Sequence, residues 1–159
     1  MFFEQAGKID QSNGLKKGII VTMQHDERPV LRRGLFKLTI TDDFSSAHCL
    51  RNYNGPCEAL HGHNFVVEAV FQGERLTQDV EMLMDFKDLK ALLKQVLDRL
   101  DHKHLNELPY FQRRNPTAEN LARYIYWELG RLMEGMPAQV AEISVFEKAT
   151  SKATYTELS

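Results

Sequence analysis

The chain has 159 residues, of which 43% are hydrophobic and 26% are charged, and its formal net charge at pH 7 is −2. This length suits one domain with a single core, and the composition is ordinary for a globular protein. The charge balance shows neither the basic excess that favours nucleic acid nor an acidic block typical of a disordered tail.

Cysteine content and N-terminal hydropathy bear on the compartment. Cys49 and Cys57 are too few and too close together to predict a disulfide framework, which favours a reducing environment. The longest apolar run near the N-terminus, residues 18–23, is too short to span a bilayer or to form the core of a signal peptide. We therefore expect a cytoplasmic protein that contacts neither membrane nor nucleic acid.

The first half of the chain predicts an extension followed by two strands. Residues 1–33 are broken by glycine and proline, and we treat them as an N-terminal extension, with a short strand at 19–21, that precedes a domain at 34–159. Residues 35–41 alternate polar and apolar side chains with the period of a half-buried strand. Turn residues occupy 51–56, and a β-branched and aromatic run then predicts a second strand from about 63 to 72.

The second half predicts two consecutive helices and two more strands. Asp85 is a good N-cap for a helix from 86 to about 100, whose apolar residues recur every three or four positions. Thr117 caps a second helix that ends before Gly135. Strands follow at about 141–147 and 152–157. Hairpin pairs separated by two helices predict an α+β fold with an antiparallel sheet.

Two histidines, His61 and His63, are spaced so that both imidazoles share one face of an extended segment. His48 ends the preceding strand pattern and offers a third imidazole. Three histidines with no fourth protein ligand are typical of catalytic zinc, which keeps one coordination position open. Cys57, four residues before the pair, is then expected beside the metal without ligating it.

Glu147 shares a strand face with Ile143 and Val145, so a carboxylate points where apolar side chains point. Burial of an unpaired carboxylate is costly, so the residue either forms a salt bridge at the strand end or serves a ligand. The pattern alone leaves both interpretations open.

These residues belong to six blocks of sequence: Phe44-Ser45-Ser46-Ala47-His48, Cys57-x-x-x-His61-Gly62-His63, Met84-Asp85-Phe86, Leu100-Asp101-His102-x-x-Leu105-Asn106, Pro116-Thr117-x-Glu119-Asn120 and Glu147. In this order and with these gaps, the chain resembles the 6-pyruvoyltetrahydropterin synthase / 6-carboxytetrahydropterin synthase family over roughly residues 35–155. A lone His-Gly-His would be weak evidence, whereas six ordered blocks are specific.

The resemblance implies the tunnelling fold (T-fold), a four-stranded antiparallel sheet with two helices on one face, in subunits that join their sheets into an oligomeric barrel. It implies a homo-oligomer, either a hexamer built as a dimer of trimers or a tetramer, with active sites at subunit interfaces. It also implies a bound Zn²⁺ ion and a small-molecule pterin substrate, 7,8-dihydroneopterin triphosphate.

The resemblance also assigns roles to individual residues. Cys57 would act as a general acid or base, and Asp101 with His102 would form the partner proton relay, which reaches the pocket from a neighbouring subunit. Glu147 would bind the pterin ring, with Thr117 close by, although an N-cap role already accounts for Thr117. The zinc ligands would be the three histidines His48, His61 and His63.

Each implied role has a physical basis. Zinc that chelates the vicinal hydroxyls of this substrate acts as a Lewis acid and eases proton loss from oxygen and the adjacent carbon. A thiol close to a cation favours its reactive thiolate form. The amino group and ring N–H of a pterin form a two-donor edge that one carboxylate accepts in bidentate fashion, which would explain the inward Glu147.

Two residues, and the length of the segment 1–33, depart from the family's common pattern. Glu58 follows Cys57, and part of the family uses glutamate in place of the cysteine and cleaves the side chain in retro-aldol fashion to 6-hydroxymethyl-7,8-dihydropterin, a folate precursor. Members with both residues resemble a bifunctional subgroup that serves the deazapurine (queuosine) and folate routes, so we expect Cys57 and Glu58 to be alternative bases. The alternative is that Glu58 is a solvated loop charge. Glu81 stands where the family often has glycine.

The expected activity is a zinc-dependent lyase that converts 7,8-dihydroneopterin triphosphate to 6-carboxy-5,6,7,8-tetrahydropterin, with 6-hydroxymethyl-7,8-dihydropterin as a second product. One alternative is a 6-pyruvoyltetrahydropterin synthase or a zinc hydrolase that acts on another heterocyclic substrate. A non-catalytic module with structural zinc would instead recruit Cys57 or Cys49 as the fourth ligand.

Overall fold

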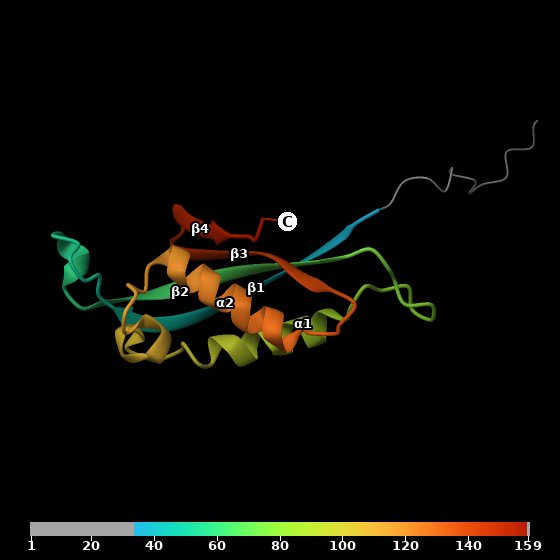
Figure 1. Cartoon of the computed structure of the whole chain (residues 1–159), viewed down its shortest axis with the longest axis horizontal. Helices are drawn as coiled ribbons and strands as arrows, with labels where there is room; N and C mark the ends of the chain where they lie inside the picture. The colour runs from blue at the N-terminus through green and yellow to red at the C-terminus, as the bar shows by residue number, and fades with distance from the viewer. Residues whose placement is uncertain (1–33, 159) are drawn as a thin grey trace, which may run out of the picture. The chain divides into compact units, whose positions relative to one another are not determined.

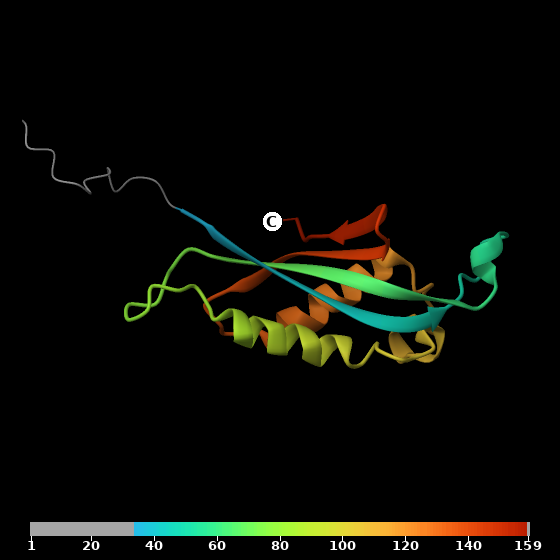
Figure 2. The same ribbon diagram turned by 180° about the vertical axis from the view of Figure 1, so that it is seen from behind.

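A computed structural model of the chain describes residues 34–158, so the extension at 1–33 and the strand predicted at 19–21 lie outside the described residues. Four strands, β1 (Phe36–His48), β2 (His61–Gly73), β3 (Gln139–Lys148) and β4 (Ser151–Tyr155), form one sheet in that order, and every neighbouring pair is antiparallel. Helices α1 (Phe86–Leu97) and α2 (Ala118–Leu132) cover one face of this sheet (Figures 1 and 2). The predicted α+β fold with two helices on one face of a four-stranded antiparallel sheet is therefore confirmed.

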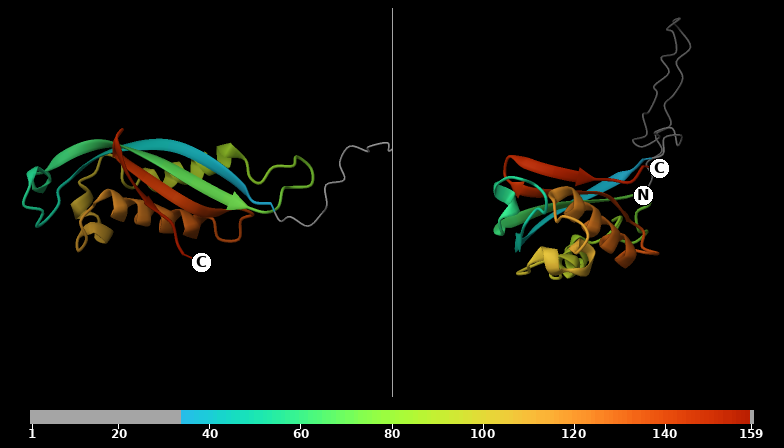
Figure 3. Two further views of the ribbon diagram at one scale, coloured as in Figure 1. Left: turned by 90° about the horizontal axis from the view of Figure 1, so that it is seen from above. Right: turned by 60° about the vertical axis from the view of Figure 1, so that its left-hand side comes forward.

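The long hairpin of β1 and β2 carries the histidine motif to one end of the sheet (Figure 3). Its register runs from Phe36 opposite Gly73 to His48 opposite His61 without a shift. Strand β1 is therefore longer than the predicted strand at 35–41. Residues 42–46 include aspartate and serine, which have low strand propensity, and pairing with β2 overrides that preference.

Both predicted helix caps are confirmed. The Asp85 side chain accepts a hydrogen bond from the Lys87 N–H at 2.8 Å, and the Thr117 hydroxyl accepts one from the Asn120 N–H at 3.3 Å. Helix α1 ends at Leu97 rather than near 100, and its first residue, Phe86, is exposed although it is part of the apolar pattern of the helix. The core lies between the sheet and the two helices, and its largest fully buried side chains are Phe44, Phe65, Phe71, Phe111, Leu89, Leu93, Leu100, Leu105, Leu121, Ile125, Leu129 and Ile143.

Residues 101–104 of the connection between the helices lie along the free edge of β1. The His102 N–H donates to the Ser45 carbonyl at 2.7 Å, and the Ala47 N–H donates to the Lys103 carbonyl at 3.0 Å. Ala47 and His104 form an isolated parallel bridge. This contact fixes the path of the chain that carries Asp101 and His102. Among residues 34–158, no helix is long and apolar enough to cross a membrane.

Glu81, the departure from the family's glycine, adopts a φ of 53° in the loop before α1. An L-residue in this left-handed conformation costs about 1–2 kcal/mol relative to the right-handed one, whereas glycine has no such penalty. We therefore expect Glu81→Gly to raise the free energy of unfolding by up to about 1 kcal/mol, once the extra unfolded-state entropy of glycine is subtracted.

Urea denaturation of the purified variants would measure this effect. Glu74→Gly is the matched control, because Glu74 is also exposed but does not have a positive φ, and it should be neutral or destabilising. Equal destabilisation by both substitutions would contradict the prediction.

Candidate functional site: a histidine cluster and its cavity

Three histidines gather at one end of the β1–β2 hairpin, on the sheet face that the helices cover. His48 and His61 are paired directly across the two strands, and His63 is two residues further along β2, on the same face. Glu147 of β3 joins them, and one ligand atom from each of the four residues lies within 4.8 Å of the others. The predicted inward direction of Glu147 thus places its carboxylate against the histidine motif.

Backbone carbonyls fix the tautomers of two rings. Nδ1 of His48 lies 2.7 Å from the Pro116 carbonyl oxygen, and Nδ1 of His61 lies 2.8 Å from the Ala59 carbonyl oxygen. A carbonyl oxygen only accepts, so both Nδ1 atoms carry the proton and both Nε2 atoms present lone pairs. The second sphere that metal-binding histidines ordinarily need is therefore in place.

The free ring nitrogens converge as metal ligands do. Nε2 of His48 lies 3.1 Å from Nε2 of His61, and two lone pairs at this distance do not make a hydrogen bond. Nitrogen ligands about 2.0–2.1 Å from a tetrahedral zinc ion are roughly 3.3 Å apart, which is close to the observed distance. Nε2 of His63 is buried and lacks a well-aligned hydrogen bond, although Oε1 of Glu147 is only 2.8 Å away. These donors fit a divalent cation.

Neither cysteine belongs to this cluster within the described chain. Cys57 is half-buried and Glu58 is exposed, and both lie in the short 3-10 turn Pro56–Glu58 between β1 and β2. The cluster consists of His48, His61, His63 and Glu147, so no thiolate completes a closed structural site. This composition argues against the non-catalytic alternative, which needs Cys57 or Cys49 as a ligand.

Burial makes the folded state of the metal-free protein sensitive to acid. Desolvation lowers the pKa of His48 and of His63 below the ordinary value of 6.5. As the pH falls through 6.5, the unfolded chain takes up protons that the folded chain does not, so the free energy of unfolding decreases. We expect the urea midpoint of metal-free protein to fall between pH 7.5 and about 5.5.

The measurement is a series of denaturation curves in chelator across this pH range. A His48→Gln variant is the control, because it removes one titrating ring, and its profile should be flatter than that of the wild type. A wild-type midpoint that stays constant over the range would contradict the assignment.

Glu147 also lines a cavity of about 470 Å³ together with Thr117, Tyr53 and Lys152. The structure therefore brings together the two residues that the sequence proposes for substrate binding. The Thr117 hydroxyl oxygen accepts the capping hydrogen bond from the Asn120 N–H, so it already caps the N-terminus of α2. Glu147 is common to the cavity and the histidine cluster.

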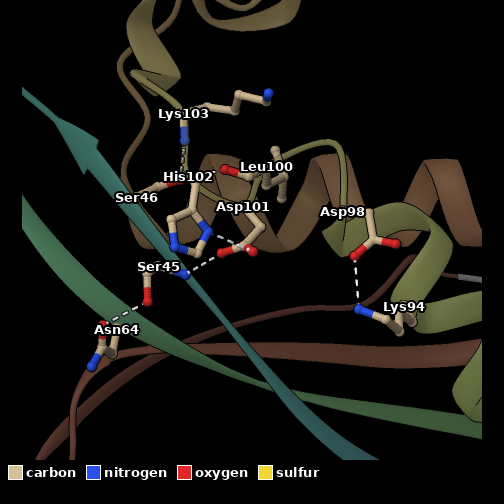
Figure 4. Close-up of polar contacts among 9 residues, drawn as sticks. All are labelled: Ser45, Ser46, Asn64, Lys94, Asp98, Leu100, Asp101, His102 and Lys103. Carbon is tan, nitrogen blue, oxygen red and sulfur yellow. Dashed lines mark hydrogen bonds and ion pairs between the residues drawn. The ribbon is translucent and has the colours of Figure 1, made fainter.

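Asp101 and His102 form a hydrogen-bonded pair at the edge of β1 (Figure 4). Oδ2 of Asp101 lies 2.7 Å from Nδ1 of His102, and Oδ1 accepts from the Ser45 N–H at 2.8 Å. The hydrogen bond from Ser45 is the largest cause that lowers the pKa of Asp101, and the hydrogen bond with His102 lowers it further. His102 is 82% exposed and has a φ of 53°, a strained conformation of the kind that collects at functional sites.

This pair is not part of the histidine cluster of its own chain. His102 lines a second cavity, of about 670 Å³, with Ser45, Asn64 and His63. Ser45 and Asn64 point to the sheet face away from the helices, because they alternate with the buried positions of β1 and β2. The exposed ring of His102 is therefore available to a group outside this chain.

Comparison with known proteins identifies the family. A family model described as 6-pyruvoyl tetrahydropterin synthase matches residues 37–158. The chain belongs to this family.

Relatives in the pterin synthase family carry two names. The chain is 28% identical over 144 residues to a 6-carboxy-5,6,7,8-tetrahydropterin synthase of Haemophilus influenzae, which covers 77% of this chain and 100% of the relative. It is 32% identical over 130 residues to a 6-pyruvoyl tetrahydrobiopterin synthase of Dictyostelium discoideum, covering 74% and 93% of the two chains. The chain is therefore an enzyme of the pterin synthase family.

Solved structures of the family share the fold. The Caenorhabditis elegans 6-pyruvoyl tetrahydropterin synthase superposes with a TM-score of 0.71 at 27% identity, covering 80% of this chain and 99% of that chain. A Plasmodium vivax 6-pyruvoyltetrahydropterin synthase, solved as a catalytic residue mutant with glutamate replaced by cysteine, superposes with a TM-score of 0.61 at 21% identity, covering 78% and 98%.

Some residues of this pterin synthase site could not be assigned from the sequence. The carbonyls of Ala59 and Pro116 orient the two rings, and any residue type can supply a carbonyl. Asn106 and Asn115 bind the backbone after His48, and of these only Asn106 stands in a family block. The position of Asn106 in that block was the one feature of the sequence that could have identified it as a residue of the site.

Proposed function

We propose that the protein is a zinc-dependent lyase that converts 7,8-dihydroneopterin triphosphate to 6-carboxy-5,6,7,8-tetrahydropterin. The observation that supports this most is the convergence of Nε2 atoms from His48, His61 and His63 beside a cavity that Glu147 lines. Relatives named 6-carboxy-5,6,7,8-tetrahydropterin synthase supply the product class. Zinc held by the three rings would act as a Lewis acid on the substrate's vicinal hydroxyls.

The substrate ring would lie in the 470 Å³ cavity, with its two-donor edge on the Glu147 carboxylate. A metal ion on Nε2 of His63 would leave Glu147 free for the ring, since the present contact between them is not a well-formed hydrogen bond. Thr117 lines the same cavity and is placed to contact the ring. Glu147 then orients the substrate so that its side chain reaches the three histidines.

Proton transfer is assigned to Cys57 and to the Asp101–His102 pair. Cys57 accepts the proton from the side-chain carbon next to the ring. Asp101 holds Nδ1 of His102 protonated, so Nε2 is the atom that accepts and returns a proton. Because His102 is 82% exposed and is not one of the four clustered residues of its own chain, we assign the relay to the cluster of a neighbouring subunit, which makes the enzyme a homo-oligomer with interfacial active sites.

Glu58 provides for a second product. It is exposed and adjacent to Cys57 in the same short turn, and we assign it as the alternative base. We assign 6-hydroxymethyl-7,8-dihydropterin to the glutamate-dependent reaction.

Incubation with 7,8-dihydroneopterin triphosphate, followed by analysis of the pterin products and of released triphosphate, tests the proposal. Wild type should give both products, and Cys57→Ala should lose the 6-carboxy product by about 10²–10⁴-fold, the usual contribution of one acid–base group. Glu58→Ala should lose only the hydroxymethyl product. A 6-pyruvoyl product would favour the alternative synthase, and full activity without Cys57 would favour a hydrolase.

A further inference from the structure

The tract of residues 49–51, directly after β1, connects the histidine cluster to Cys57. It begins next to His48, whose Nε2 belongs to the cluster. In its middle, the Leu50 N–H donates a hydrogen bond to the Cys57 carbonyl at 2.8 Å. The position of Cys57 relative to His48 therefore depends on how firmly the 49–51 tract is held.

Two asparagine side chains hold the tract, one on each side of Leu50. Oδ1 of Asn106 accepts from the Cys49 N–H and its Nδ2 donates to the Cys49 carbonyl, both at 2.9 Å. Asn115 makes the same pair of bonds to the Arg51 N–H and carbonyl, also at 2.9 Å. This two-bond contact is what a hydrogen-bonded residue pair makes in an antiparallel ladder. The two amides thus replace a strand partner where the sheet has ended.

The asparagines are themselves fixed in the connection between α1 and α2. Nδ2 of Asn120 donates to the Asn115 carbonyl at 2.9 Å at the start of α2. The next residue, Pro116, accepts the bond at 2.7 Å that orients the His48 ring. Asn106 lies in the 3-10 turn Leu105–Glu107 of the same connection. The connection between α1 and α2 therefore positions both a ring of the cluster and the tract that is hydrogen-bonded to the Cys57 carbonyl.

We propose that Asn106 and Asn115 are positioning residues that hold Cys57 in register with the histidine cluster. The inference rests on the proposed function, in which Cys57 transfers a proton at the substrate side chain. Loss of either amide leaves a backbone N–H and carbonyl of the tract without protein partners. The tract then shifts, and a displacement of about 1 Å at a reacting group costs roughly 100-fold in rate.

Steady-state kinetics of zinc-loaded Asn106→Ala and Asn115→Ala test this role. The control is Gln112→Ala, which removes an exposed amide from the same connection, bonded only to the Glu107 carbonyl at 3.5 Å. We expect kcat for the 6-carboxy product to fall about 10–100-fold in both asparagine variants, with KM and zinc content unchanged. Gln112→Ala should match the wild type.

The same substitutions in a Cys57→Ala background separate positioning from general damage. There Asn106→Ala should cause no further loss of rate, because the group that it positions is absent. Equal losses in the two backgrounds would overturn the proposal, as would zinc loss in proportion to kcat. If one asparagine variant fails to fold, the other carries the same comparison.

Alkylation of Cys57 gives a readout that needs no substrate. In a Cys49→Ser background, iodoacetamide reacts with Cys57 as the remaining described thiol, and its rate is followed against pH in zinc-loaded protein. The half-buried Cys57 should react several-fold faster in the asparagine variants, because the tract is loosened. An unchanged alkylation profile would overturn the proposal. Absence of turnover in the wild type would instead refute the proposed function.

Discussion

Replacement of His61 by alanine is expected to remove the bound metal and to reduce pterin turnover to background while the fold remains. His61 is partly exposed at the first residue of β2, so its side chain contributes little to the core. Loss of a partner that only orients a metal ligand costs about 10–100-fold in metal affinity, and loss of the ligand itself should cost more. The measurements are zinc content after dialysis, circular dichroism and turnover.

Two further variants sharpen this result. His104→Ala is the matched control, because His104 also lies near the end of the sheet but is outside the cluster, and it should keep its zinc. Glu147→Gln should also keep zinc but raise KM, since Glu147 is assigned to the pterin ring. If Glu147→Gln loses zinc as readily as His61→Ala, Glu147 is a fourth metal ligand and its assignment to substrate is wrong.

The sequence could predict the cluster because strand periodicity is short and rigid. His61 and His63 share a face wherever the segment is extended, and an inward Glu147 follows from the same alternation in β3. The caps of both helices could also be predicted from the sequence, because Asp85 and Thr117 each bind a backbone N–H in the first turn of their own helix. Local rules thus fixed the parts of the site that lie on regular elements.

The remaining parts depend on long-range pairing that has no local signal. Strand β1 continues to His48 through residues of low strand propensity because β2 lies opposite. The path of residues 101–104 along the edge of β1 determines where His102 points. The sequence of this segment has no periodicity that predicts this path. Asn106 is separated by 57 positions in the chain from the residue that it binds, and Asn115 by 64 positions. Only the folded chain shows them.

The position of His102 leads to the second large expectation, that two inactive variants restore activity to each other. Cys57→Ala and His102→Asn should each reduce turnover by about 10²–10⁴-fold. Asparagine tolerates the left-handed backbone at position 102, so the fold should be preserved. In one chain, His102 lies at the edge of β1 beside a different cavity from the one that Glu147 lines. Under the proposed function, each active site would combine the cluster and Cys57 of one subunit with the relay of another.

Co-refolding of the two variants in equal amounts is the test. With random assortment, roughly one quarter of two-subunit sites receive an intact Cys57 and an intact His102, and activity should recover to about that fraction of wild type. The control mixture pairs Cys57→Ala with His61→Ala, whose lesions fall in the same half of the site, so no assortment yields a complete site. Failure of the first mixture to exceed the second would show that His102 serves its own chain, because only a relay contributed by a neighbour lets two defective chains complete one site.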